Sequence, residues 1–107
     1  MTLNEYQTLA ARTINTKGST LDIIGHALHG LAAEVGEVHS LYQKEYQGHP
    51  LDLGELKKEA GDIMWFVAEL CTAYEWTLEE VAQANIAKLL HRYPNGFEAD
   101  RSIHREE

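Results

Sequence analysis

Two short acidic segments carry side chains of the type that bind divalent cations. Segments 34–37 (EVGE) and 59–62 (EAGD) each place two carboxylates three residues apart. On a helix, positions i and i+3 lie on one face, so each segment presents its two carboxylates in one direction. Four facing carboxylates repel one another unless a cation neutralises them, and all-oxygen ligation suits Mg²⁺ or Mn²⁺. The sequence therefore predicts a metal site made of Glu34, Glu37, Glu59 and Asp62.

The alternative interpretation is that both segments are solvated helix faces, because most charged residues lie at protein surfaces. A glycine precedes the second acid in each segment, at Gly36 and Gly61. Glycine inside a helix costs about 1 kcal/mol relative to alanine. Two glycines at matched positions favour the metal site and predict that helices or metal ligands approach closely there.

The charge of the chain limits its partners. The net charge is −8 at pH 7, which argues against duplex DNA or RNA because phosphate backbones are bound through clustered Lys and Arg. A small phosphate ligand is still compatible, since acidic residues hold a cation and the cation holds the phosphates. We therefore expect no nucleic-acid partner.

Length and composition indicate one globular domain over 1–107, with 44% hydrophobic and 24% charged residues. The single cysteine, Cys71, excludes an internal disulfide and is expected in the core. No apolar run approaches the roughly 18 residues of a membrane span, and no signal peptide is evident. We expect a cytoplasmic protein without a membrane partner.

Apolar periodicity, together with capping boxes formed by Thr2 with Glu5 and by Thr77 with Glu80, predicts four helices at about residues 2–14, 21–47, 53–75 and 78–93. The second and third carry apolar residues at alternating steps of three and four, which is typical of long paired helices. No segment alternates with the period of a strand. The fold class is therefore all-α, a bundle of about four helices with the second and third antiparallel. The polar tail from about residue 97 is expected to be mobile.

The helical positions place both acidic pairs beside the apolar seams of the second and third helices. Glu55 and Glu69 extend the acidic stripe on the third helix in both directions. Carboxylates at the border of a core are partly desolvated, and there an unpaired charge is costly and a bound cation gains most over water. Both effects favour a bound cation.

With these helices in place, the sequence resembles the MazG family of all-α nucleoside triphosphate pyrophosphohydrolases. Four blocks occur in the family's order: 30–37 (GLAAEVGE), 59–68 (EAGDIMWFVA), 85–89 (NIAKL) and 92–97 (RYPNGF). The resemblance implies hydrolysis of a nucleoside or deoxynucleoside triphosphate between its α and β phosphates, with Mg²⁺ as cofactor. It also implies that the four acids named above are the metal ligands. Among them Glu37 is our candidate for orienting or deprotonating the attacking water.

The predicted fourth helix carries polar residues that the family's Asn-x-x-Lys block implicates in substrate binding. Asn85, Lys88 and Arg92 share one face of it, where Lys and Arg would neutralise phosphates and Asn would bond sugar or base. The alternative is a solvated cationic face, which a helix C-terminus favours anyway. Trp65 would stack on a base, or alternatively pack in the core.

Three other assignments are possible at the outset. The first, a di-iron bundle, is disfavoured because such bundles use Glu-x-x-His pairs and no histidine follows a glutamate by three residues here. A phosphoribosyl-ATP pyrophosphatase uses similar acidic helices. A catalytically silent helical module would keep the shape without the reaction. Apolar stripes on long helices, together with the resemblance, predict a homodimer or homotetramer.

Overall fold

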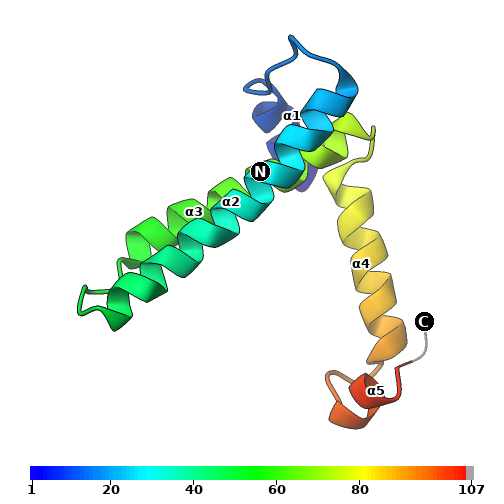
Figure 1. Ribbon diagram of the computed structural model, residues 1–107. Coiled ribbons are helices and arrows are strands. Elements are labelled where there is room, and N and C mark those ends of the chain that lie inside the picture. The colour runs from blue at the N-terminus through cyan, green and yellow to red at the C-terminus, as the bar shows by residue number, and fades with distance from the viewer. Residues whose placement is uncertain (106–107) are drawn as a thin grey trace.

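The computed structural model describes residues 1–105 and consists of helices joined by short turns (Figure 1). The helices are α1 (Leu3–Ala11), α2 (Thr20–Tyr46), α3 (Leu53–Ala73), α4 (Leu78–Arg92) and α5 (Ala99–Ile103). Within residues 1–105 no strand forms, and the only bridge is an isolated one between Pro94 and Gly96. The predicted all-α class is therefore confirmed. None of the described helices has both the length and the apolar character needed to span a membrane.

Local capping explains where the helices begin. The predicted capping boxes at Thr2 and Thr77 are both present. A third box, formed by Ser19 with Asp22, starts α2 and was not predicted. The helix α1 ends at Ala11, earlier than predicted, because the next three backbone N–H groups bond to carbonyls three residues back. The segment expected to be a mobile tail contains α5, and its mobility stays a prediction.

The long helices α2 and α3 form the predicted antiparallel pair, joined by the turn at 47–52 (Figure 1). The short helix α1 packs against α3 near the open end of this pair. The fourth helix, α4, packs against α1 and then projects away from α2 and α3 (Figure 1). The chain is therefore an elongated helical pair with a separate arm.

Two side chains of α1 orient the arm: the Asn4 amide oxygen accepts the backbone N–H of Glu79 at 3.3 Å, and Gln7 makes three further hydrogen bonds. The Gln7 side-chain amide donates to Thr72 Oγ1 at 3.1 Å and to the Trp76 carbonyl at 2.8 Å. Its oxygen accepts the backbone N–H of Leu78, the first residue of α4, at 2.8 Å. Three hydrogen bonds from one residue thus tie α1 to the turn between α3 and α4.

The interior of the single chain is small. Among the described residues only Ala27, Ala68, Glu69 and Cys71 are buried, so the expectation for the cysteine is confirmed. The radius of gyration is 17.1 Å, compared with about 13 Å for a typical compact domain of this length. The chain on its own therefore leaves large surfaces of its helices uncovered.

The glycine prediction is wrong within the chain. A Cβ added at Gly36 or Gly61 would meet nothing within 4 Å, so neither glycine marks a close approach of described atoms. The close approach occurs instead at Gly30, where an added Cβ would collide with the ring of Phe66. The absence of a side chain at Gly30 is what lets the Phe66 ring of α3 pack directly onto α2.

Candidate metal centre

Three of the four predicted ligands come together where α2 faces α3. Glu34 lies on α2, and Glu59 and Asp62 lie on α3. One carboxylate oxygen from each lies within 4.8 Å of the others. The antiparallel pairing produces this meeting, because it brings the middle of α2 opposite the first half of α3. Glu37 is not a member of this close group, although its charge acts on Glu34. We call Glu34, Glu59 and Asp62 the acidic cluster.

One carboxyl group of the acidic cluster has a raised pKa. The pKa of Glu34 is raised to about 7, chiefly by a hydrogen bond between its carboxyl group and that of Glu59. Partial burial adds to this, and so does repulsion from the charges of Glu59, Asp62 and Glu37. The four sequence-predicted acids therefore interact electrostatically even though only three lie within a common ligation distance.

A second observation points to a positively charged ligand at the same place. Oε2 of Glu34 is inaccessible to solvent and has no hydrogen-bond partner among the described residues. A buried carboxylate oxygen without a partner is costly. A divalent cation bound by the acidic cluster would satisfy this atom and remove the repulsion. The donor set consists of carboxylate oxygens, which suits Mg²⁺ or Mn²⁺ better than softer metals.

A phenol on α1 interacts electrostatically with the acidic cluster. Burial raises the pKa of the Tyr6 phenol, and the nearby charge of Asp62 raises it further. The helix α1 packs against α3, and this packing lets the charge of Asp62 act on the Tyr6 phenol. Tyr6 precedes both acidic segments by many residues, so only the packing of α1 on α3 reveals the proximity.

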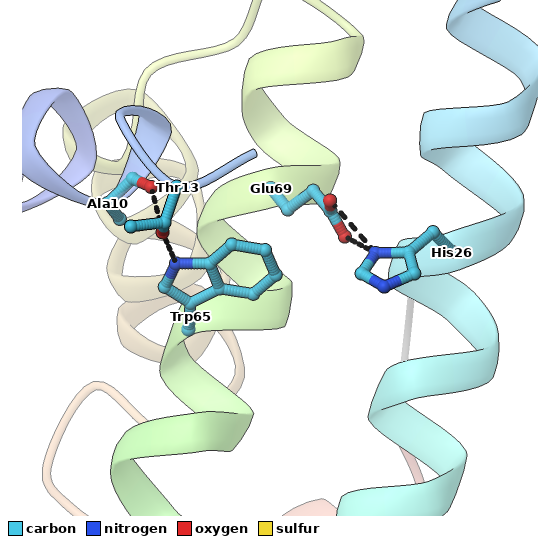
Figure 2. A network of polar contacts seen from close by, with 5 residues as sticks. All are labelled: Ala10, Thr13, His26, Trp65 and Glu69. Atoms are coloured by element: carbon cyan, nitrogen blue, oxygen red, sulfur yellow. Dashed lines mark hydrogen bonds and ion pairs between the residues drawn. The ribbon is translucent and has the colours of Figure 1, made fainter. Parts of the chain in front are cut away.

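A second polar pair connects the same two helices, and the sequence analysis missed it. Nδ1 of His26 lies 2.8 and 3.0 Å from the two carboxylate oxygens of Glu69 (Figure 2). The Glu69 side chain is only 2% exposed, whereas that of His26 is 60% exposed. The sequence places Glu69 in the acidic stripe of α3, but the structure separates it from the acidic cluster and gives it a histidine partner. The sequence feature that could have indicated this buried pair is a single glutamate, Glu69, among apolar residues.

Trp65 lies between the acidic cluster and Glu69 along α3. Its indole N–H donates to Thr13 Oγ1 at 2.9 Å, and the Thr13 hydroxyl donates to the carbonyl of Ala10 (Figure 2). The indole ring stands at 89° to the ring of Phe66, with centroids 5.1 Å apart. The side chain is half-buried and held in one orientation. Stacking on a base stays a prediction.

The predicted phosphate-binding face lies on the arm. Asn85, Lys88 and Arg92 belong to α4, which diverges from α2 and α3 (Figure 1). The single chain therefore does not bring these residues to the acidic cluster. At the far end of α4, a pocket of about 270 Å³ is lined mostly by basic and histidine side chains. These are His91, Arg92, Arg101, His104 and Arg105, together with Asp100.

Comparison with known proteins shows the family of the chain. Residues 25–97 match the family described as the MazG nucleotide pyrophosphohydrolase domain. The chain is 28% identical over 105 residues to the Gene 37 protein of Mycobacterium phage L5, covering 90% of this chain and 92% of that protein. No solved structure matches the chain. The matched segment includes both acidic segments, Trp65 and the whole of α4, and the chain belongs to the MazG nucleotide pyrophosphohydrolase domain family.

Proposed function

We propose that the protein is a Mg²⁺-dependent nucleoside or deoxynucleoside triphosphate pyrophosphohydrolase that releases a nucleoside monophosphate and pyrophosphate. The observation that carries the proposal is the acidic cluster, in which Glu34 keeps a buried carboxylate oxygen without a partner. The family membership supports a nucleotide substrate. When bound, Mg²⁺ neutralises phosphate charge and lowers the pKa of an attacking water.

The protein side chains have separate tasks in this proposal. Glu34, Glu59 and Asp62 hold the cation, with Mn²⁺ as a second choice of metal. Glu37 lies one turn after Glu34 and outside the close group, so its carboxylate is available to complete the ligand shell or to orient the water and accept its proton. Trp65 offers its ring to the base from the next turn of α3.

The substrate side of the site requires more than one chain. A triphosphate approaching four acids needs cationic partners, and Lys88 and Arg92 are on the diverging arm. We infer that Asn85, Lys88 and Arg92 reach the acidic cluster of a second copy. Association of two chains then brings the acidic cluster of one chain together with the phosphate-binding residues of the other.

The surface of α2 supports association with a second copy. Leu28, Val35 and Tyr42 are 52%, 45% and 48% exposed, and they follow one another at seven-residue steps. This spacing forms a continuous ridge along a helix, as in coiled-coil seams. On α4, Ile86 and Leu90 are 55% and 60% exposed. We infer a homodimer, or a homotetramer of two such dimers, that covers the ridge and the arm.

The direct test measures products. Purified protein with Mg²⁺ is incubated with each common NTP and dNTP, and both monophosphate and pyrophosphate are quantified. The variants Glu34→Gln and Asp62→Asn should lose Mg²⁺-dependent turnover and keep their helical circular dichroism. Glu45→Gln, at the exposed end of α2, is the matched control and should retain the rate. Turnover in both cluster variants would show that the acids are misassigned.

The same experiment decides between the enzyme and the silent helical module. Absence of pyrophosphate from every substrate, in protein that still forms a defined oligomer, would favour the module. Phosphoribosyl-ATP is added to the substrate panel. Hydrolysis of this substrate alone would identify the related phosphoribosyl-ATP pyrophosphatase instead.

A further inference from the structure

A pocket of about 350 Å³ opens beside the His26–Glu69 pair. Its lining residues are Asn15, Gly18, Asp22, Ile23, His26 and Glu69. We propose that this pocket is the nucleobase subsite of the hydrolase proposed above, and that His26 selects bases that carry an exocyclic amino group. The inference rests on the proposed function for its substrate class and on the pocket for its selectivity.

The order of side chains along α3 matches the order of the parts of a nucleotide. Asp62, Trp65 and Glu69 follow at steps of three and four, so they lie on one face of α3. Seven residues of helix span about 10 Å, which separates the acidic cluster from Glu69. Sugar hydroxyls lie nearer the α-phosphate than the outer edge of a base does. If the phosphate of a nucleotide lies at Asp62 and its base lies near Trp65, the part of the nucleotide that reaches Glu69 is therefore the edge of the base and not the sugar.

The charge of the pocket fixes which end of the substrate enters. Two carboxylates line it, those of Asp22 and Glu69. The Asp22 carboxylate accepts the backbone N–H of Ser19 at 2.9 Å, and Glu69 is held by His26. These anionic acceptors repel phosphate and favour N–H donors. At the exocyclic position of the base, an amino group donates to such a lining, whereas the carbonyl that uracil and thymine carry there cannot.

Contacts at Nδ1 and at the ring hold His26 in one orientation. Nδ1 contacts both oxygens of Glu69, and the ring packs against Trp65 and Phe66, with centroid distances of 6.2 and 5.6 Å. A carboxylate at Nδ1 favours the tautomer that carries the proton there, which leaves Nε2 as an acceptor. Within residues 1–105 Nε2 has no hydrogen-bond partner. Glu69 is thus a positioning residue, and His26 is the group that contacts the base.

The test compares base preference in matched variants at pH 8. Values of kcat/KM are measured for cytidine and adenosine triphosphates and for uridine and thymidine triphosphates. In His26→Ala, the preference for amino-bearing bases should fall about three- to tenfold, mainly through KM, as expected for one lost hydrogen bond. Glu69→Gln should reduce the same preference. His29→Ala, exposed one turn further along α2, should leave it unchanged.

A binding measurement separates this inference from the proposed function. Cytidine and uridine monophosphates are titrated without Mg²⁺ into protein labelled at histidine nitrogens, and the Nε2 resonance of His26 is followed. We expect a larger shift with cytidine monophosphate. A wild type that hydrolyses nothing but shows this shift would overturn the hydrolase and keep the subsite. Normal hydrolysis with unaltered base ratios in His26→Ala and Glu69→Gln, and equal shifts for both nucleotides, would overturn the subsite alone.

Discussion

The affinity for Mg²⁺ should depend on pH through a single carboxyl group. Glu34 has a pKa raised to about 7. It is therefore roughly one-tenth ionised at pH 6 and nine-tenths ionised at pH 8, by the ordinary titration relation. The cation binds only the ionised form, so the proton competes with it. We expect the affinity for Mg²⁺ to rise about tenfold between pH 6 and pH 8.

Isothermal titration calorimetry with Mg²⁺ measures this effect at pH 6, 7 and 8. Repeating each titration in buffers with different ionisation enthalpies counts the protons released, which should approach one per cation at pH 6 and fall toward zero at pH 8. Glu34→Gln should weaken binding and flatten its pH dependence. Glu45→Gln should behave as the wild type. A wild-type affinity that is constant from pH 6 to pH 8, without proton release, would refute the assignment.

Four further predictions follow from the described contacts. The pKa of Glu34 is raised in the folded protein, so the contribution of this carboxyl to stability is full below its ordinary pKa near 4.5 and is lost as pH rises through about 7. The Tm of metal-free protein should therefore fall between these pH values, and a Tm that is constant over this range would contradict the raised pKa. Gly30→Ala should destabilise by about 1–3 kcal/mol in urea unfolding, because its Cβ collides with Phe66, whereas Gly36→Ala, which meets nothing within 4 Å, should be neutral or stabilising. Thr13→Ala removes the hydrogen bond to Trp65 and should cost about 1 kcal/mol by the same assay, with no loss meaning that the bond is not formed in solution. Light scattering should give two or four times the 12.1 kDa chain mass for the wild type and a lower mass for Leu28→Glu; a wild-type mass of one chain would exclude the oligomer.

Local signals in the sequence predict much of this fold. The capping residues Thr2 and Thr77 begin helices as expected, because each cap depends only on neighbours three residues away. The pairing of α2 with α3 follows from their apolar periodicity, and it brings Glu34 opposite Glu59. The meeting of these acids was therefore predictable from spacing alone.

The remaining features depend on contacts between distant residues. The direction of α4 depends on hydrogen bonds from α1, among them those of Gln7, whose partners lie 65 to 71 residues along the chain. The free-energy cost of a glycine inside a helix depends on the helix itself, whereas the atoms that pack against the glycine come from distant parts of the chain. For this reason the close helix approach was predicted at Gly36, although it occurs at Gly30. Likewise, nothing in the spacing of Glu69 identifies His26 as its partner, because the two are 43 residues apart.

The small interior has a consequence for how the protein behaves on dilution. Burial of two alanines, a cysteine and a paired glutamate offsets little of the conformational entropy that the described residues lose on folding. In the proposed dimer, much of the apolar area that stabilises each chain is provided by the other chain. Folding and association then share one equilibrium, so Tm should increase with protein concentration. At low concentration, activity and helical structure should disappear together.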